Sequence, residues 1–437
     1  MTPSRQRLLK TTQFSTDIAA ILAATWSLHS SGAVLLVAPL TLGMYRLAVT
    51  LSHYSIRRPF WDELHDMLGA VLLMAGLHAG VLLSLDRSWD KSSFLCGWLL
   101  ALFMLPLARN TMRQLLRRLG LWQHPMILVG DGDNSRDALL ALVNEPAMGY
   151  QLQAYVRPDA NGQWLKQHPH AMVMVALEPE QGELLGEVLH QLSSAGRDYF
   201  VIPALRGLPL QGLASFHTFS HEVLLLRASN HLNQLPSQLM KRLFDVSGSL
   251  VLLALLLPVM LGLALRLLVE GHPVLFWHER VGRHGKSFQC PKFRTMTPDA
   301  DARLEKLLRT CETSRTEWEE RRKLRNDPRV TQLGRFLRET SLDELPQLWS
   351  VFRGDMSLVG PRPVTRGELT HYGDNVSYYK QVLPGITGLW QVSGRSEADY
   401  PTRVALDVWY VRNWSLWTDV VILLKTVGVV LKRRGAY

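Results

Sequence analysis

The chain has 437 residues, of which 47% are hydrophobic, and it carries a formal net charge of +10. This length allows about two or three domains, and a basic excess suits nucleic acid, an anionic membrane surface or an anionic substrate. Because arginine and lysine flank the apolar segments, and because zinc-ligand spacing and basic-aromatic motifs are missing from the sequence, we expect lipid and no nucleic acid. The three cysteines form no CxxC pair, which argues against a disulfide framework and indicates a reducing compartment.

Four apolar segments open the chain, at residues 14–29, 32–50, 67–85 and 93–108. Each approaches the ~20 apolar residues that a membrane-spanning helix needs. Basic residues precede the first segment, separate the second from the third and follow the fourth. The positive-inside rule therefore puts the N-terminus and everything after residue 110 in the cytoplasm. The pattern predicts a four-helix transmembrane bundle over residues 1–118, with a buried soluble bundle as the alternative.

A soluble α/β pattern follows over residues 119–227. Residues 126–129 are typical of a strand, 130–133 of a turn and 135–143 of a helix. Further strands are predicted near residues 154–156, 172–175 and 200–202. The opening is Rossmann-like, but Ser135 stands where the third glycine of the dinucleotide fingerprint belongs. We favour a structural or regulatory domain, with a bound nucleotide as the alternative.

After a linker at residues 228–240, an apolar run at residues 246–269 contains Pro258. Proline inside a helix removes a backbone hydrogen bond and kinks the helix. Basic residues flank the run on both sides, at Lys241, Arg242, Arg280, Arg283 and Lys286. Both flanks therefore favour the cytoplasm, and we predict a re-entrant membrane helix that bends at Pro258 instead of a straight span.

Two adjacent carboxylates, Asp343 and Glu344, stand at a predicted helix start, and Arg338 precedes them. Carboxylates beside arginine suit a site that binds a metal ion and a phosphate together. The structural alternative is a capping box, because Ser341 and Glu344 fit the Ser-x-x-Glu pattern.

Other polar residues are weaker candidates. Lys292 and Arg294 bracket Phe293, as in a strand that points two basic side chains to one face, where they would bind phosphate or form surface salt bridges. Gln391 and Arg395 lie in a glycine-rich loop that can approach a nucleotide closely. Nearer the C-terminus, an apolar run up to Leu431 predicts an interfacial amphipathic helix.

Several ordered motifs in residues 241–437 resemble those of the bacterial sugar transferases. They are Glu279-Arg280-Val281-Gly282-Arg283, Lys292-Phe293-Arg294-Thr295-Met296, Ser341-Leu342-Asp343-Glu344-Leu345-Pro346-Gln347, the segment 354–363 and the segment 384–395. These proteins are monotopic phosphoglycosyl transferases, also called polyprenyl-phosphate hexose-1-phosphate transferases. A four-helix N-terminus followed by an α/β domain is similar to their large subgroup, which includes undecaprenyl-phosphate galactose and glucose phosphotransferases.

The resemblance implies a catalytic domain over residues 241–437. In this family a UDP-sugar donates its sugar-1-phosphate to undecaprenyl phosphate and UMP is released. The covalent phosphosugar intermediate would form on Asp343, with Mg²⁺ as cofactor and with Glu344 assisting in metal binding or proton handling. Arg338 matches the family's phosphate-binding arginine, and Arg362 is a second candidate. The family commonly has a Ser-Pro pair at the helix break, whereas Leu257 precedes Pro258 here.

The resemblance also implies a biological setting. We expect a multi-pass protein of the bacterial inner membrane whose soluble and catalytic domains face the cytoplasm. It would use galactose or glucose in the first membrane step of O-antigen, capsule or exopolysaccharide synthesis, and it could form a homodimer through the α/β domain or the bundle. The alternative function is a catalytically silent membrane scaffold or a nucleotide sensor based on the α/β domain.

Overall fold

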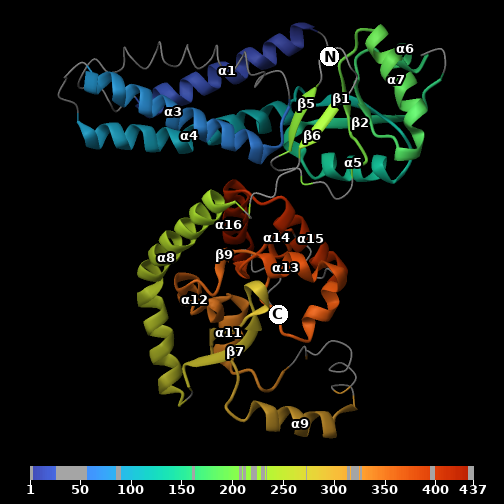
Figure 1. Ribbon diagram of the computed structural model, residues 1–437. Helices are drawn as coiled ribbons and strands as arrows, with labels where there is room; N and C mark the ends of the chain where they lie inside the picture. Colours follow the sequence, from blue (N-terminus) through green and yellow to red (C-terminus); the bar gives the residue numbers. More distant parts are fainter. Residues whose placement is uncertain are drawn as a thin grey trace. The chain divides into compact units, whose positions relative to one another are not determined.

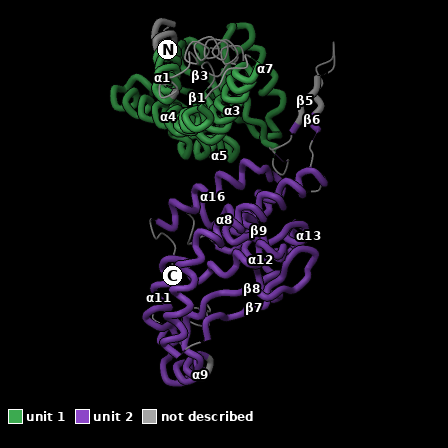
Figure 2. Tube along the Cα trace, turned by 90° about the vertical axis from the view of Figure 1, so that its left-hand side faces the viewer, with its two compact units in different colours: residues 1–206 green, residues 207–437 purple. Residues whose placement is uncertain are grey.

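The computed structural model describes residues 3–25, 57–84, 90–159, 163–205, 209, 213–217, 224–227, 232, 234–271, 273–312, 315, 324, 327–393 and 399–431. The chain forms two compact units, residues 1–206 and residues 207–437 (Figures 1 and 2). The predicted second apolar segment, residues 32–50, lies outside the described residues.

Among the residues that the structure describes, the first unit begins with three long helices, α1 (Pro3–Thr25), α3 (Phe60–Ser84) and α4 (Lys91–Arg118). Asp90 caps α4 by accepting hydrogen bonds from the backbone N–H groups of Ser92 and Ser93 at 3.0 and 3.3 Å. Apolar side chains such as Val71 and Ala101 form the core between the helices. Two of these helices, α3 and α4, are long and apolar enough to cross a membrane, as is α8 (Leu235–Val269) in the second unit.

A four-stranded parallel sheet completes the first unit. Its elements are β1 (His124–Val129), α5 (Asp133–Val143), β2 (Tyr150–Val156), α6 (Gln163–Gln167), β3 (Met172–Val175), α7 (Gly182–Ser194) and β4 (Tyr199–Val201). The strand order is β2-β1-β3-β4. Branched and sulfur-containing apolar side chains, which fit a sheet buried on both faces, fill β1 and β3. The predicted strands and the predicted helix are confirmed, although β2 begins four residues earlier than expected.

The second unit combines short strands with helices (Figure 1). Its first elements are β5 (Ala214–His217), β6 (Leu224–Arg227), α8, β7 (Leu275–Val281), β8 (Ser287–Phe293), α9 (Ala300–Thr310) and α11 (Gln332–Glu339). The remaining elements are α12 (Gln347–Arg353), β9 (Ser357–Val359), α13 (Val376–Gln381), β10 (Gly385–Thr387), α14 (Leu389–Val392), α15 (Tyr400–Arg412) and α16 (Leu416–Leu431). β7 and β8 form an antiparallel hairpin, and β9 and β10 form a parallel pair. Buried side chains such as Leu348, Val351 and Ile422 form the core.

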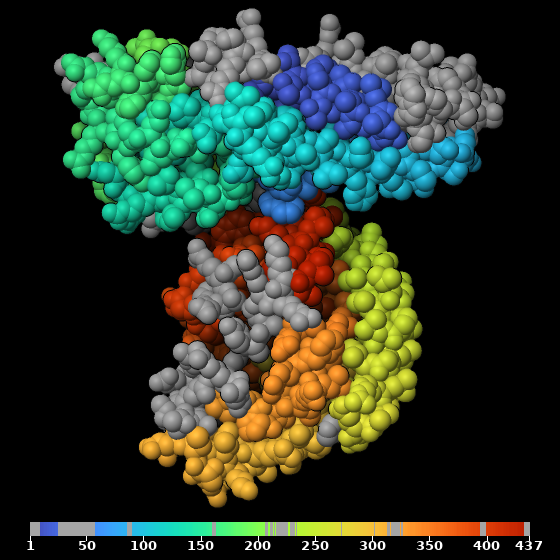
Figure 3. All heavy atoms as spheres, turned by 180° about the vertical axis from the view of Figure 1, so that it is seen from behind, coloured from blue at the N-terminus to red at the C-terminus, as the bar shows by residue number. Residues whose placement is uncertain are grey.

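Helix α8 carries the exposed apolar surface of this unit. It runs continuously through Pro258 and is bowed (Figure 1). Leu250, Leu255 and Leu265 are 55%, 70% and 63% exposed. Figure 3 shows α8, in yellow-green, at the edge of the unit with its outer side chains uncovered. An apolar surface of this extent is unfavourable in water and favourable in lipid, and α8 is long and apolar enough to cross a membrane.

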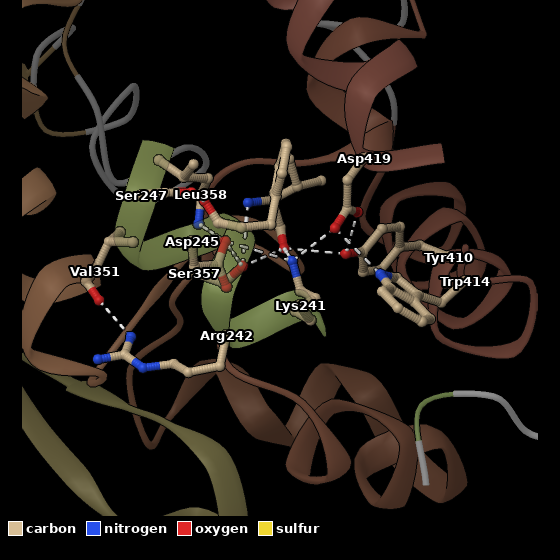
Figure 4. Close-up of polar contacts among 12 residues, drawn as sticks. Lys241, Arg242, Asp245, Ser247, Val351, Ser357, Leu358, Tyr410, Trp414 and Asp419 are labelled. Carbon is tan, nitrogen blue, oxygen red and sulfur yellow. Dashed lines mark hydrogen bonds and ion pairs between the residues drawn. The ribbon is translucent and has the colours of Figure 1, made fainter. Parts of the chain in front are cut away.

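The start of α8 fixes strand β9, which leads directly to Arg362 (Figure 4). Asp245 is 1% exposed. Its Oδ1 accepts hydrogen bonds from Ser357 Oγ and from the backbone N–H of Leu358, both at 3.0 Å. Because these charge-assisted bonds are buried, they hold the first turns of α8 and β9 in one arrangement.

Lys241 joins the same strand to α16 (Figure 4). Its Nζ donates to the Val359 carbonyl at 3.1 Å and to Asp419 Oδ2 at 2.7 Å. Tyr410 donates its hydroxyl to Asp419 Oδ1 at 2.8 Å, and Trp414 Nε1 donates to Asp419 Oδ2 at 3.2 Å. The buried carboxylate is thereby paired and hydrogen-bonded, as burial of a charge requires.

Candidate active site

Asp343 and Glu344 lie in a tight turn between α11 and α12. Helix α11 ends at Glu339, and Ser341 then adopts the left-handed conformation, with φ 56° and ψ 17°. One turn of 3₁₀ helix follows over Leu342–Glu344. The capping-box interpretation is wrong, because the Ser341 side chain makes no capping hydrogen bond. A non-glycine residue in this conformation costs about 1–2 kcal/mol, and such positions cluster at functional sites.

Strand β8 brings Lys292 to the second carboxylate. Lys292 Nζ donates to Glu344 Oε1 at 2.5 Å, and both side chains are about one-quarter exposed (23% and 24%). Burial alone would raise the pKa of Glu344. Lys292, Arg362 and Arg280 together outweigh burial and lower this pKa below its usual value. Glu344 is therefore a fixed anion at neutral pH.

Asp343 has the opposite electrostatic character. Its pKa is raised to about 6, chiefly because the side chain is partly buried, and the neighbouring Glu344 charge adds to the rise. Lys292 and Arg338 act in the other direction. The carboxylate is mostly ionised at neutral pH, yet it is more basic than an ordinary aspartate and is therefore a better nucleophile. Two adjacent carboxylates with separated pKa values can serve two different roles.

Gly334 allows α11 to bring Arg338 to this turn. A Cβ at Gly334 would lie 2.0 Å from the Thr295 carbonyl oxygen, so only glycine permits this close packing. Thr331 caps α11 by accepting from Gly334 N–H at 2.9 Å. Arg338, in the last turn, donates from Nε to Thr295 Oγ1 at 2.9 Å. Burial lowers the pKa of Arg338 and the Asp343 charge opposes that effect, so the guanidinium lies within electrostatic range of Asp343.

Arg362 approaches Glu344 from a different element. Its exposed guanidinium lies 5.9 Å from the centre of the Trp390 ring, and its charge lowers the pKa of Glu344. The guanidinium of Arg403 also lies over this ring, 4.8 Å from its centre. Gly360, two residues before Arg362, allows this segment to pack closely against Leu383, since a Cβ at Gly360 would lie 2.5 Å from the Leu383 carbonyl oxygen. Arg362 is therefore an exposed cation beside Trp390 that acts on the Glu344 carboxylate.

Sequence reasoning did not assign a role to Arg280 or Glu368. Arg280 Nη1 donates to Glu368 Oε2 at 3.0 Å, and Arg280 Nη2 lies 3.3 Å from His278 Nδ1. His278 and Arg280 alternate along β7 on the face shared by Lys292, because the register pairs Phe276 with Lys292. The available signal was this alternation, but only the hairpin register relates it to Lys292.

The remaining candidates differ in what the structure describes. Arg294 follows β8, and its Nε is buried without a hydrogen-bond partner among the described residues, while its guanidinium lies 5.8 Å from the Phe276 ring. Gln391 is partly buried in α14 beside Trp390. Arg395 lies outside the described residues.

The donor set of the turn fits Mg²⁺ only with help from a substrate. The described residues contain no group of three or more histidine, cysteine, aspartate or glutamate side chains that could hold a metal ion. Asp343 and Glu344 supply hard oxygen ligands, and Lys292 already uses one oxygen of Glu344. Mg²⁺ is commonly bound by one or two carboxylates together with substrate phosphates and water, which is the arrangement that this pair allows.

The turn after β1, the other candidate site, is occupied by a carboxylate of the chain itself. Glu178 Oε1 accepts from the backbone N–H of Asn134 at 2.7 Å, at the start of α5. A Cβ at Gly132 would lie 2.2 Å from the same oxygen. Asn134 Nδ2 donates to the carbonyls of Leu177 and Ile202 at 3.0 and 2.9 Å, and so ties α5 to the ends of β3 and β4. A dinucleotide would place its pyrophosphate at this helix start, so the geometry favours the structural interpretation.

Known proteins resemble the chain over both units. The bacterial sugar transferase family matches residues 236–433. A UDP-galactose-lipid carrier transferase of Erwinia amylovora is 43% identical, over 89% of this chain and 85% of that protein. An undecaprenyl-phosphate galactose phosphotransferase of Salmonella typhimurium is 41% identical over the same shares. The exopolysaccharide production protein ExoY of Rhizobium meliloti is 49% identical over 45% of this chain and 88% of that protein.

Proposed function

Because the chain belongs to the bacterial sugar transferase family, we propose that it transfers the sugar-1-phosphate of a UDP-sugar to undecaprenyl phosphate. The observation that carries the proposal is the ionised but basic Asp343 beside a Glu344 that Lys292 holds as an anion. The two relatives that cover most of the chain are named for galactose, so UDP-galactose is the first donor to test. The product would begin a surface polysaccharide.

The proposed chemistry has two displacement steps. An Asp343 carboxylate oxygen attacks the phosphorus that bears the sugar, the bond from this phosphorus to the bridging oxygen breaks, and UMP leaves with that electron pair. A phosphate oxygen of undecaprenyl phosphate then attacks the same phosphorus, and Asp343 leaves. The product is undecaprenyl diphosphate sugar, and the carboxylate is regenerated.

The cations around the turn stabilise the charge of this reaction. Arg338 is held by Thr295 and lies near Asp343, which suits it to bind the phosphate under attack. Arg280 and Arg362 act on Glu344 from two other elements and would bind the leaving phosphate. Asp343 and Glu344 would hold Mg²⁺, which when bound neutralises the diphosphate and polarises its phosphoryl oxygens.

The membrane arrangement is part of the proposal. We propose four membrane helices within residues 1–118, an α/β domain over 119–227, a linker over 228–240 and a catalytic domain over 241–437. The last six residues of the predicted linker, from Leu235, already belong to α8. Helix α8 would enter the cytoplasmic leaflet of the inner membrane, bend near Pro258 and return. The support is its exposed apolar surface between two basic flanks. Such a helix would bring the catalytic turn to the depth of a lipid phosphate.

The test is UMP release by the purified full-length protein with Mg²⁺, undecaprenyl phosphate and a panel of UDP-sugars. We expect UMP from one donor and a loss of at least about a thousandfold in Asp343→Asn, because the amide cannot replace a nucleophilic carboxylate. Asp355→Asn is the matched control, since Asp355 lies in the nearby α12–β9 turn and contacts Arg353. UMP release by folded Asp343→Asn at the wild-type rate would contradict the nucleophile assignment.

A further inference from the structure

A cavity of about 280 Å³ lies in the second unit, and neither Asp343 nor Glu344 lines it. Its walls come from the start of α8, from the turn between β7 and β8, and from the segment after α13. One part of the wall is apolar and includes Leu235, Leu239 and Leu383. The residues that line the cavity are therefore different from those of the proposed catalytic turn.

The other part of the wall is basic. Lys241, Arg242 and Arg283 line the cavity, together with the carboxylate of Asp245. Lys241 is neutralised by Asp419, which lies 2.7 Å away. Arg242 donates to the carbonyls of Val351 and Phe352, both at 2.7 Å, and these partners carry no charge (Figure 4 shows the contact with Val351). Among the described residues no carboxylate forms an ion pair with Arg242, so its charge is not neutralised as that of Lys241 is.

Arg283 supplies the hydrogen-bonding group that a ligand would satisfy. It stands in the rigid turn of the β7–β8 hairpin, where Gly282 N–H donates to the Lys286 carbonyl at 2.7 Å. Its Nε is buried and has no hydrogen-bond partner among the described residues. An unsatisfied buried donor costs about 1–3 kcal/mol, more when it is charged. An anion in the cavity would remove this cost.

The position of the cavity indicates what kind of anion enters. Leu235 and Leu239, on α8, are 73% and 69% exposed, and the same helix continues into the apolar stretch that is long enough to cross a membrane. An amphiphile could thus place its charged group on the two arginines and its chain along the leucines. We infer that the cavity binds the phosphate head group of an anionic phospholipid, at a site distinct from the one where the proposed transfer occurs.

The test uses the full-length protein in detergent, titrated with a short-chain phosphatidylglycerol and, separately, with the matching phosphatidylcholine. We expect saturable binding of phosphatidylglycerol, at least tenfold tighter than that of phosphatidylcholine. Arg283→Gln should weaken it by about tenfold, which is the worth of one charge-assisted hydrogen bond. Lys286→Gln is the control, because it removes the same charge from an exposed residue of the hairpin that does not line the cavity.

Equal losses in these two variants, or equal binding of both lipids, would overturn the inference in favour of a diffuse surface charge. Leu239→Gln retains both arginines, and it should weaken phosphatidylglycerol while leaving inorganic phosphate unaffected. If inorganic phosphate displaces the lipid at equal concentration, the site recognises an ion and the inference fails. If undecaprenyl phosphate displaces it at lower concentration than phosphatidylglycerol itself, the cavity belongs to the acceptor and the phospholipid assignment is wrong. Failure here leaves the UMP assay of Asp343 unchanged, so the two proposals are tested separately.

Discussion

Lys292 Nζ lies 2.5 Å from Glu344 Oε1, so the lysine of β8 is bonded to the second carboxylate of the pair and not to the first. This contact separates the two acids electrostatically. Glu344 has a lowered pKa, whereas the pKa of Asp343 is raised to about 6. The neighbour that is held as an anion also makes Asp343 more basic, which strengthens Asp343 as a nucleophile.

Asp343→Asn should increase the stability of the protein while it abolishes transfer. The pKa of Asp343 is higher in the folded protein, about 6, than in an unfolded chain, so folding favours the protonated form. The free energy of unfolding therefore falls as pH rises from about 4 to about 6, and above that range the charged side chain destabilises the fold. Asparagine removes a cost on the order of 1 kcal/mol. Thermal unfolding in detergent at pH 7.5 should show a higher midpoint for the variant.

The same measurement at pH 4.5 separates this account from a simple packing effect. At that pH Asp343 is largely protonated in the folded state, so the two unfolding temperatures should differ clearly less than at pH 7.5. An equal gain at both pH values would mean that the charge of Asp343 is not what destabilises the fold.

Lys292→Met should move the acid limb of the pH–rate profile to higher pH. The wild-type rate should fall below about pH 6, because Asp343 becomes protonated there. Lys292 lowers the pKa of both Asp343 and Glu344, so its loss should raise the midpoint by roughly one pH unit, as expected for removal of a nearby charge. Lys292→Arg retains the charge and should restore the midpoint even where it does not restore the rate. An unchanged midpoint in Lys292→Met would contradict the proposed coupling.

The sequence predicted the elements more completely than it predicted the contacts. The pattern at residues 126–129 was sufficient for strand β1 because a short apolar run followed by turn residues is a local signal. Ser341 satisfied a local capping rule, yet the structure places it in a left-handed turn, because the chain must reverse between α11 and α12. Glu178 lies far along the chain from Gly132, and no spacing rule relates a carboxylate to a glycine turn that distant. The Arg280–Glu368 ion pair could not be predicted for the same reason, since only the tertiary fold brings these two residues together.

Lys241→Met should destabilise the second unit and reduce transfer. Asp419 is fully buried, and loss of its cation would leave an uncompensated charge, at a cost of about 3 kcal/mol. Because Lys241 also holds the Val359 carbonyl, the strand that leads to Arg362 should lose its fixed position. Asp419→Asn is the matched variant. It removes the buried charge and can still accept from Tyr410, so it should lose clearly less stability in the same unfolding assay. Equal losses would indicate that the hydrogen bonds, and not the charge, dominate.

Asp407→Asn should flatten the dependence of stability on pH. Tyr372 donates its hydroxyl to Asp407 Oδ2 at 2.7 Å, and burial raises the pKa of Asp407 to about 7 although Tyr372 and Arg403 lower it. The folded pKa exceeds the unfolded value, so this side chain stabilises the fold below about pH 4 and that contribution is lost as pH rises through about 7. Asparagine keeps the Tyr372 contact without a charge. Unfolding midpoints at pH 5 and pH 8 should differ less in the variant, and an identical difference would show that Asp407 does not titrate in this range.

Both flanks of α8 should be reached by a hydrophilic thiol reagent from the cytoplasmic side. Gln234 and Pro273 are exposed beyond the two ends of the helix, and single cysteines there report the two flanks. The background needs replacement of Cys96 and Cys311 only, because Cys290 is 1% exposed and burial raises its pKa to about 11, which suppresses its reactivity.

A re-entrant helix predicts that a membrane-impermeant maleimide labels both positions in inverted vesicles and neither in intact spheroplasts. Cysteine at Leu257, beside Pro258, should stay unlabelled until detergent is added, since that side chain would lie in lipid. Labelling of Gln234→Cys and Pro273→Cys from opposite sides would mean that α8 crosses the bilayer despite its proline and its two basic flanks.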